Sequence, residues 1–434
     1  MFFKVVRYKY PMLDLIIVGA GPAGIGLLSS IYRKQHTSTE EPLKICLIDS
    51  SVSKHFGKLA NYNINSDTRA EKFLTCLNNL PPSVLSAPKL ETSTKALRTF
   101  GSRAAPLPLV GEFYRALGHE ICQDMISNNH LELRANIAVQ SAAWQGHHWS
   151  VKTESFGREK IISAKHLVLA CGASEPVDRL DSFLDTYALK TNDLKSYVMS
   201  SEVLKAGPSE EYLETLRTLS NPKVSIIGGS HSAISAAGKF LAQDIAFRSS
   251  GISILYRSEM RVTFNSAEDA VRHGFTDFVE DDICPHTKRV HALKGFRLDS
   301  KNLLSAVKGY GGVTLEKRIN LTSITSEQAN HIRSNLQNAD LVVSALGYEP
   351  DYFDLIDGTT GQKIDLNAPN YVDKSSRLLN ANQAVIPNCY ALGLASNYNL
   401  AGRFGEPSFT GQANGLVLWY KQIGAELAST IIGN

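Results

Sequence analysis

The stretch Leu-Asp-Leu-Ile-Ile-Val-Gly-Ala-Gly-Pro-Ala-Gly at residues 13–24 decides the fold of this 434-residue chain. Its apolar first half predicts a buried parallel strand, and the G-x-G-x-x-G turn behind it predicts the start of a helix. Gly19 permits the tight turn, Gly21 lets a pyrophosphate approach the backbone, and Gly24 allows helix and strand to pack closely. The stretch therefore predicts a dinucleotide site, with the phosphates at the N-terminus of the helix.

A second strand, residues 44–48, ends at Asp49, where a carboxylate can accept hydrogen bonds from an adenosine ribose. A polar, aromatic and non-periodic stretch follows at 57–66 and is read as a loop or short strands; an ordinary solvated loop is an equally good interpretation. The predicted contacts of this first nucleotide are Gly19, Gly21, Pro22, Ala23, Gly24, Asp49, Ser50 and Gly57.

A second, altered glycine turn follows the apolar strand at 223–227. Ser230 occupies its middle glycine position and Ala233 its last, and the serine hydroxyl can bond a phosphate. The predicted contacts of a second nucleotide are Gly228, Gly229, Ser230, His231 and Ser232. Because His231 and Ser232 lie in a phosphate turn, nucleotide contact is a better interpretation of them than nucleophilic catalysis.

The strand after this second turn ends in Tyr256, Arg257 and Ser258, where the first unit has an acid. An acid would repel a 2′-phosphate, whereas Arg257 can bind one, so the sequence favours NADPH over NADH. An exposed surface arginine is the alternative interpretation.

Composition excludes several other classes of protein. The net charge of +3, without a dense basic tract, gives no reason to expect nucleic-acid binding. Residues 1–12 are too short and interrupted for a signal peptide or a membrane span, and predict an N-terminal arm or an extra strand.

The six cysteines are scattered without a C-x-x-C pair, which argues against a disulfide framework, a zinc site and a dithiol reductase, and is typical of a cytoplasmic protein. They are Cys46, Cys76, Cys122, Cys171, Cys284 and Cys389. The polar residues at 260–300 match no metal-ligand pattern, so we expect a solvated loop there and no metal.

The order of the segments predicts an α/β protein with two Rossmann-like dinucleotide-binding domains, the first discontinuous and carrying a β-meander. Short strands at 131–169 form the predicted meander, and an apolar strand at 167–172 closes the first half of the domain. A strand at 341–346 and a return segment with a strand at 388–393 and a helix at 416–431 follow. The predicted domains are 1–180, first segment of the FAD domain; 181–345, NADPH domain with its linker; and 346–434, return segment of the FAD domain.

With two nucleotide turns and a return segment, the chain resembles the two-dinucleotide-binding-domain flavoproteins, and among them the class B flavin monooxygenases. It is most similar to the L-ornithine and L-lysine N-hydroxylases. The resemblance rests on the turns at 19–24 and 228–233, on 344–348, which is similar to the family's Ala-Thr-Gly-Tyr, on Ser200-Ser201, and on Phe264-Asn265. The chain departs from the family at Met199, where a histidine is usual, and at Ser266, where an acid is common; the F-x-G-x-x-x-H fingerprint of other branches is not seen near 180–205.

The resemblance implies FAD at the first turn and NADPH at the second, with Gly393, Phe409 and Thr410 of the return segment at the flavin. It also implies that Asn265 is the catalytic residue that contacts nicotinamide. The implied reaction is insertion of one oxygen atom from O₂ into a small-molecule substrate through a flavin C4a-(hydro)peroxide, with N-hydroxylation in a biosynthetic pathway as one form.

Two other functions stay open at this point: an NAD(P)H-dependent flavoprotein reductase without oxygenation, and a non-catalytic scaffold. The extra segments 81–110 and 176–222 favour a substrate pocket over a plain reductase, although 81–110 can also be a connector. The intact first turn argues against a scaffold. Basic residues near this region, which would suit an anionic substrate or a solvated face, are Lys95, Arg98, Arg103 and Arg115. The substrate and the oligomeric state cannot be read from the sequence.

Overall fold

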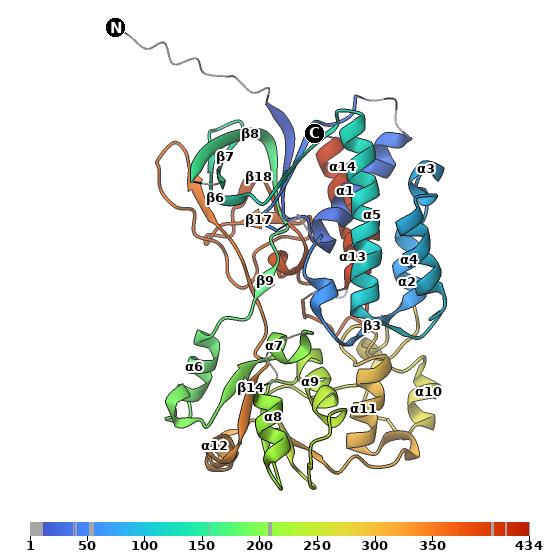
Figure 1. The fold of residues 1–434 in the computed structure, drawn as a ribbon, viewed down its shortest axis with the longest axis vertical. Helices are drawn as coiled ribbons and strands as arrows, with labels where there is room; N and C mark the ends of the chain where they lie inside the picture. The colour runs from blue at the N-terminus through green and yellow to red at the C-terminus, as the bar shows by residue number, and fades with distance from the viewer. Residues whose placement is uncertain are drawn as a thin grey trace.

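The computed structural model describes residues 12–37, 39, 41–51, 56–155, 157–206, 211–400, 403–412 and 415–433. Two lobes, each built around one main sheet, make up this part of the chain (Figure 1). The predicted arm or strand at 1–12 lies outside the described residues apart from Met12. Within the described residues, no helix is both long and apolar enough to span a membrane.

The sheet of the first lobe has nine strands, and β8, β1, β2 and β5 are adjacent and parallel, with β5 at one end of the strand order. Leu15, Ile16 and Ile17 are fully buried, as expected for a strand covered on both faces. The strands are β1 (Leu13–Val18), β2 (Ile45–Asp49), β5 (Leu131–Ala135), β6 (Ala138–Trp144), β7 (Trp149–Ser155), β8 (Arg158–Leu169), β16 (Asp354–Asp357), β17 (Arg377–Leu379) and β18 (Val385–Ala391).

The meander is smaller than the sequence predicts. β6, β7 and β8 are antiparallel, but the predicted first meander strand is β5, which pairs in parallel with β2. The reason is the helix α5 (Leu107–Ser127), which precedes β5 and forms the crossover connection that a parallel pair of strands needs. β8 belongs to both parts, because it pairs antiparallel with β7 and in parallel with β1.

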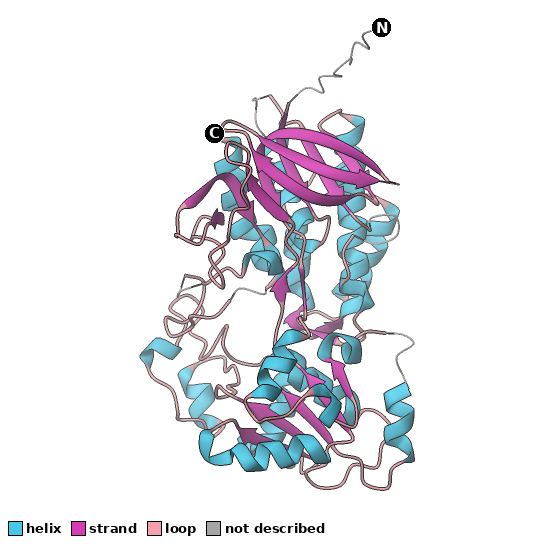
Figure 2. Ribbon diagram, turned by 90° about the vertical axis from the view of Figure 1, so that its left-hand side faces the viewer, coloured by secondary structure: helices cyan, strands magenta, loops and turns pink. Residues whose placement is uncertain are grey.

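Helices pack against this sheet on the side of α5 (Figures 1 and 2). α1 contacts α5, α13 and α14, so the first and the last helices that the structure describes lie in one layer. The predicted C-terminal helix is broken at Gln422 into α13 and α14. The helices are α1 (Pro22–His36), α2 (Ala70–Phe73), α3 (Pro82–Leu85), α4 (Pro88–Arg98), α13 (Leu416–Lys421) and α14 (Ile423–Ile432), and a small sheet pairs β3 (Asn65–Arg69) with β4 (Ala104–Pro106).

The second lobe has a five-stranded parallel sheet in the order β10-β14-β11-β12-β13. Its strands are β10 (Tyr197–Met199), β11 (Val224–Ile227), β12 (Ile252–Tyr256), β13 (Ile319–Ser323) and β14 (Leu341–Ser344). Its helices are α6 (Asp178–Asp185), α7 (Ser200–Leu204), α8 (Glu211–Thr218), α9 (His231–Leu241), α10 (Ala267–Arg272), α11 (Leu298–Lys308) and α12 (Ala329–Asn338). The two sheets together confirm the predicted α/β class with two Rossmann-like units.

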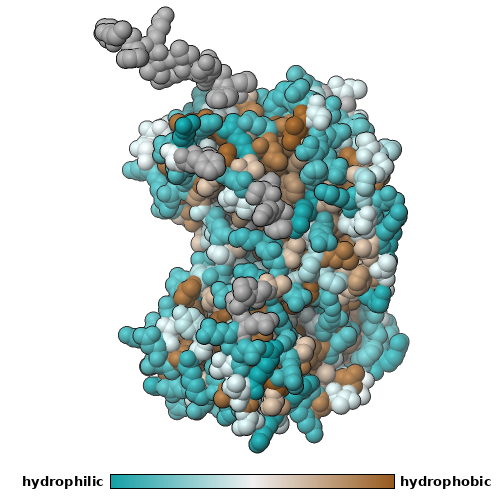
Figure 3. Space-filling model, viewed as in Figure 1, coloured by the Kyte–Doolittle hydropathy of each residue, from teal (hydrophilic) through white to brown (hydrophobic). Residues whose placement is uncertain are grey.

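The chain passes between the lobes through two short strands that lie side by side. β9 (Ala173–Ser174) leads out of the first lobe, and β15 (Glu349–Pro350) pairs with it on the way back (Figure 1). After β15 the chain adds β16, β17 and β18 to the first sheet. The space-filling view shows an indentation between the lobes (Figure 3). The exact domain ranges remain a prediction.

Candidate nucleotide and substrate site

A cavity of about 1460 Å³ lies between the two lobes, and both glycine turns contribute to its wall. Most residues predicted from the sequence as nucleotide contacts line it. They are Gly19, Gly21, Pro22, Ala23, Asp49, Ser50, Gly57, Gly229, Ser230, His231, Ser232, Gly393, Phe409 and Thr410. The parallel strands of both sheets end at this cavity, where ligands of open α/β sheets bind.

The first turn has the shape that a pyrophosphate needs. A Cβ on Gly19, which has a φ of 107°, would lie 2.2 Å from the carbonyl oxygen of Ala170, and one on Gly24 would lie 2.0 Å from that of Gly19. A Cβ on Gly21 would meet nothing closer than 3.9 Å, so the space above Gly21 is open toward the cavity. α1 begins there without a side-chain cap, which leaves its N–H groups for an anion. The first turn therefore fits the FAD pyrophosphate.

Asp49, at the end of β2, has the environment of a ribose acceptor. One carboxylate oxygen accepts the N–H of Ala20 at 2.6 Å, and the other accepts the N–H of Ser51 at 2.7 Å. These bonds fix the carboxylate at the cavity wall. The Ser51 hydroxyl donates to the same oxygen as the Ser51 N–H, whereas the oxygen that accepts from Ala20 keeps a lone pair for a ligand hydroxyl.

The second turn repeats this geometry in the other lobe. A Cβ on Gly228, with a φ of 132°, would lie 2.3 Å from the carbonyl oxygen of Ala345. Ser230 is the N-cap of α9, and its hydroxyl makes no capping bond, so it stays available at the cavity wall. These residues fit a second nucleotide phosphate.

His231 follows as the first residue of α9 and contacts both lobes. Its Nε2 lies 3.3 Å from a carboxylate oxygen of Asp67, outside hydrogen-bond geometry, and its ring centroid lies 4.5 Å from that of Phe296. Burial lowers the pKa of His231, and the carboxylate of Asp67 opposes this only partly. The imidazole is therefore neutral at pH 7.

Four predicted site residues do not line the cavity. Gly24 and Gly228 act by close packing, as described above. Arg257 is exposed at the end of β12, next to Glu259, Met260 and Arg261, which do line the cavity. Asn265 is exposed, and its backbone N–H and side-chain amide both donate to Asp269 at the start of α10. The catalytic role of Asn265 remains a prediction.

The return segment packs directly on the first turn. Gly393 has a φ of 76°, and a Cβ there would lie 2.5 Å from Cβ of Ala23. Phe409, Thr410 and the first residues of α13 continue the cavity wall. Of the described residues in the extra segments 81–110 and 176–222, only Leu107 and Leu204 line the cavity. The chain at 81–110 folds instead against α5.

Two tyrosines that the sequence analysis does not include among the site residues connect three parts of the wall. The Tyr348 hydroxyl is hydrogen-bonded to Tyr62 of the first lobe and to Ser232 of the second turn. Burial, followed by the nearby Tyr62, raises the pKa of Tyr348, so the phenol stays protonated and can donate. Tyr348 lies in the 344–348 motif, but nothing in the sequence indicates that its hydrogen-bond partner is Tyr62.

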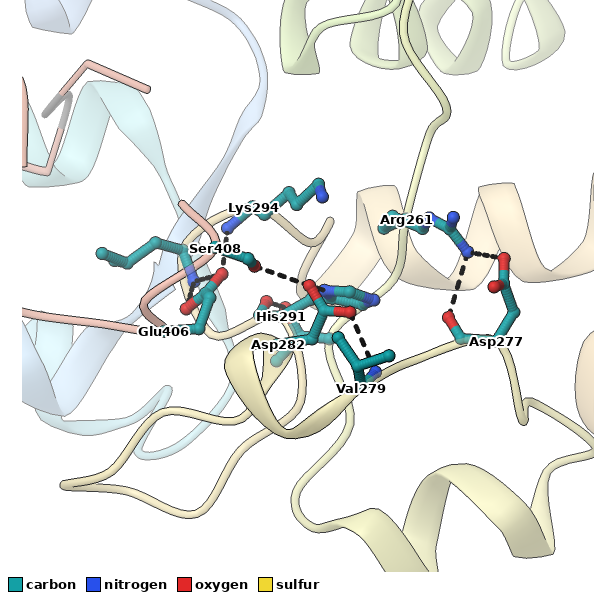
Figure 4. A network of polar contacts seen from close by, with 10 residues as sticks. Arg261, Asp277, Val279, Asp282, His291, Lys294, Glu406 and Ser408 are labelled. Atoms are coloured by element: carbon teal, nitrogen blue, oxygen red, sulfur yellow. Dashed lines mark hydrogen bonds and ion pairs between the residues drawn. The ribbon is translucent and has the colours of Figure 1, made fainter. Parts of the chain in front are cut away.

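A polar clasp joins the return segment to the loop formed by residues 279–297 (Figure 4). The fully buried carboxylate of Glu406 accepts the N–H of Leu293 at 3.0 Å and that of Lys294 at 2.8 Å. The Ser408 hydroxyl donates to Asp282 at 2.5 Å, and His291, 1% exposed, lies 3.6 Å from the same carboxylate. The expectation of a solvated loop is thus met only in part, because residues 285–288 are exposed whereas Val290 and His291 are buried.

The match to a family model settles the class of protein. The model for pyridine nucleotide-disulphide oxidoreductases matches residues 13–395, most of the chain. The chain belongs to this family. Its members are oxidoreductases that bind FAD and a pyridine nucleotide, which confirms the predicted oxidoreductase class and the predicted FAD and pyridine-nucleotide cofactors; the choice of NADPH over NADH remains a prediction.

Individual relatives are distant but extend over the whole chain. The chain is 22% identical to the CMP-5′-(3-aminopropyl)phosphonate hydroxylase of Streptomyces rubellomurinus, over 96% of this chain and 97% of that protein. The ornithine hydroxylase of Pseudomonas aeruginosa is 16% identical with a TM-score of 0.55, over 98% of this chain and 99% of that one. The FAD-bound cadaverine monooxygenase of Erwinia amylovora is 14% identical with a TM-score of 0.54, over 98% and 95%. These solved structures show the shared fold.

The family name includes disulphide chemistry, but the thiols of this member are poorly suited to it. All six cysteines are free, and Cys171 is the one that lines the cavity. Burial raises the pKa of the Cys171 thiol to about 12, so almost no reactive thiolate forms near neutral pH. Among the described residues, no group of three or more His, Cys, Asp or Glu side chains could hold a metal ion.

Proposed function

We propose that this protein is an FAD-dependent, NADPH-consuming monooxygenase that adds one oxygen atom from O₂ to the amino nitrogen of a small molecule. One observation carries the proposal: both nucleotide turns open onto a single cavity of about 1460 Å³. A pocket for one small ligand usually has roughly 300–1,000 Å³. The cavity therefore offers space for two coenzymes to meet and for a substrate beside them.

FAD reduced by NADPH supplies the redox chemistry, so the protein acts by binding, orienting and excluding water. The N–H groups at the start of α1 bind the flavin nucleotide, and Ser230 offers its hydroxyl to the second nucleotide. Tyr348, bonded to Tyr62 and Ser232, holds the two lobes together at the cavity wall. His231, whose pKa is lowered by burial, adds no positive charge beside the second turn.

The substrate class in this proposal is a primary amine that carries an anionic group. The name of the Streptomyces relative, which matches the whole chain, describes an aminopropyl phosphonate linked to a nucleotide. The relatives of known structure include an ornithine hydroxylase and a cadaverine monooxygenase, whose named substrates are also amines. These names support an amino nitrogen as the oxidised atom.

A flavoprotein reductase is the alternative, favoured by the family description. A dithiol reductase needs two neighbouring thiols that exchange electrons with the flavin. Here Cys171 is the one cysteine in the cavity wall, and burial raises its pKa. This arrangement favours oxygen transfer over disulfide reduction.

The test is a substrate panel with the FAD-loaded enzyme. Ornithine, cadaverine and 3-aminopropylphosphonate, free and linked to CMP, are incubated with NADPH and O₂, and products are analysed by mass spectrometry. We expect one amine to gain one oxygen atom that derives from labelled O₂. NADPH oxidation that yields only hydrogen peroxide with every amine, together with turnover of a disulfide, would favour the reductase. A colourless protein that does not bind FAD would indicate a scaffold.

A further inference from the structure

The ring of His231 and the carboxylate of Asp67 face each other at the junction of the lobes. His231 begins α9 in the second lobe, and Asp67 belongs to β3 of the first. Both residues line the cavity, and Nε2 of His231 lies 3.3 Å from Oδ2 of Asp67. This Nε2 atom is buried and, among the described residues, has no hydrogen-bond partner. The two polar groups therefore come from different lobes and meet in the cavity wall.

The second oxygen of Asp67 explains why the carboxylate stays in this position. Oδ1 accepts the hydroxyl hydrogen of Ser300 at 3.1 Å, in the first turn of α11. In the part of the chain that the structure describes, no lysine or arginine lies within ion-pair distance of Asp67. Burial lowers the pKa of His231, so the ring carries no charge that would pair with Oδ2 at pH 7. Oδ2 is thus fixed in place and left for a hydrogen-bond donor of a ligand.

The position of His231 at the second turn indicates which ligand reaches these atoms. The N–H groups at the start of α9 have no side-chain cap and fit the phosphates of the second nucleotide. The turn that fits FAD lies in the first lobe, so the nicotinamide end of the second nucleotide has to extend from α9 toward that lobe. Asp67 is a first-lobe residue that faces the start of α9 on this route. The group between the phosphates and the nicotinamide is a ribose with two hydroxyls.

We propose that Asp67 and His231 bind the ribose on the nicotinamide side of the second nucleotide. A carboxylate is a usual acceptor for ribose hydroxyls in dinucleotide sites, and an imidazole nitrogen can serve a second hydroxyl as donor or acceptor. Two adjacent hydroxyls match two open atoms that lie 3.3 Å apart. Both lobes then hold the nucleotide, with its nicotinamide directed toward the first lobe. The contact goes beyond the proposed function, because a reductase of the same family needs the same nicotinamide position.

A purely structural role of Asp67 is the competing explanation. Its bond to Ser300 joins β3 to α11, and beside it the side-chain amide of Asn65 donates to Asp299 at 2.7 Å. Two variants separate the roles. Ser300→Ala removes the connection to α11 but keeps the free oxygen, whereas Asp67→Asn removes the charge that faces His231. Asp299→Asn is the matched charge control, since Asp299 is exposed and does not line the cavity.

The experiment measures binding by calorimetry on the FAD-loaded protein. The probes are NADP⁺, NAD⁺ and adenosine 2′,5′-bisphosphate, which lacks the nicotinamide ribose. We expect D67N to raise the Kd of NADP⁺ and of NAD⁺ by the same factor, about tenfold or more, because a charge-assisted hydrogen bond is lost. H231Q should raise both about threefold, the effect of one neutral hydrogen bond. The Kd of the bisphosphate should not rise in either variant, and S300A and D299N should match the wild type with every probe.

Three results would overturn this contact. The first is an unchanged Kd of NADP⁺ in D67N and H231Q proteins whose thermal midpoints and flavin contents are normal. The second is an equal rise for the bisphosphate in D67N, which would separate Asp67 from the nicotinamide side. The third is an equal loss of NADP⁺ affinity in S300A, which would leave Asp67 only its structural role. If D67N fails to fold, H231Q decides by the same comparison of probes. Because no turnover is measured, loss of this contact and failure of oxygen transfer are separate results.

Discussion

Gly21 and Gly24 belong to one turn, but a methyl group added to each would meet different surroundings. At Gly21 it would point into open space, with no atom closer than 3.9 Å, whereas at Gly24 it would lie 2.0 Å from the Gly19 carbonyl oxygen. Gly21 has an extended backbone with a φ of −68°, which alanine also adopts. We therefore expect Gly21→Ala to lose FAD while the apoprotein keeps its thermal midpoint. Flavin absorbance after purification and thermal denaturation of the FAD-free protein measure the two effects.

Gly24→Ala is the companion variant. The clash with Gly19 separates β1 from α1, and we expect the apoprotein to lose about 1–3 kcal/mol or more of stability. If Gly21→Ala lowered the apoprotein midpoint as much as Gly24→Ala, or kept its full flavin content, the assignment of the open space to a pyrophosphate would be wrong.

Arg257 carries the proposed choice of coenzyme. It is exposed at the end of β12, beside residues of the cavity wall. We expect Arg257→Gln to lower kcat/KM for NADPH about 10- to 100-fold and to leave NADH within about twofold, because NADH lacks the 2′-phosphate. Steady-state flavin reduction with both coenzymes measures this, and Arg248→Gln, an exposed arginine of the same lobe, is the control. An equal loss with both coenzymes would remove Arg257 from this role.

At the residue scale, the sequence predicts a position best where backbone geometry alone determines the residue. Gly19 and Gly228 have positive φ angles and closely packed surroundings. Because glycine is the residue that fits such positions, they can be recognised from the sequence. The partners of Glu406 could not be predicted in this way, because Leu293 and Lys294 come from a segment that only the tertiary fold brings to it. The buried His291 was hidden for the same reason, since it lies among polar residues in the sequence.

At the scale of elements, the clasp offers the clearest test. Glu406 is fully buried and accepts three backbone hydrogen bonds from Leu293 and Lys294. Glu406→Gln keeps the shape but replaces one acceptor oxygen by an amide that faces an N–H donor. We expect a loss of about 1–3 kcal/mol in the free energy of unfolding, measured in urea.

Glu426→Gln is the matched control for this clasp. Glu426 pairs with Arg403 at the surface, where an ion pair contributes about 0–1 kcal/mol. A change in Glu406→Gln no larger than that of the control would mean that the clasp does not hold the loop.

The elements themselves were predictable to different degrees. The strands at both glycine turns follow from apolar runs with turn residues behind them, and α5 follows from its helical pattern. β5 was assigned to the meander, because a single strand does not reveal whether its neighbour runs parallel or antiparallel. The break between α13 and α14 has no proline to mark it and depends on packing against α1.

At the scale of the whole molecule, the path of the chain was predictable because repeated βα units and a return strand leave few topologies. The pairing of β18 with β8 and the family match agree with that path. The contacts between the lobes were not predictable. Glu406, Tyr348 and the 279–297 loop connect residues more than 100 positions apart, and polar side chains in single segments do not indicate such partners.

The last prediction concerns acid stability, through His291 between the lobes. Its side chain is 1% exposed, and burial lowers its pKa to about 4; the carboxylates of Asp282 and Asp277 oppose this, while Lys294 and Arg261 add to it. Between pH 6.5 and about 4 the unfolded chain binds a proton on this histidine and the folded chain does not, so stability falls as the pH is lowered. The full effect of His291 is roughly 3 kcal/mol. We expect His291→Gln to flatten the dependence of the unfolding free energy on pH in this window, while exposed His286→Gln leaves it unchanged. Equal slopes in the wild type and in His291→Gln would show that the imidazole is already charged in the folded protein, and would refute its burial as a neutral ring.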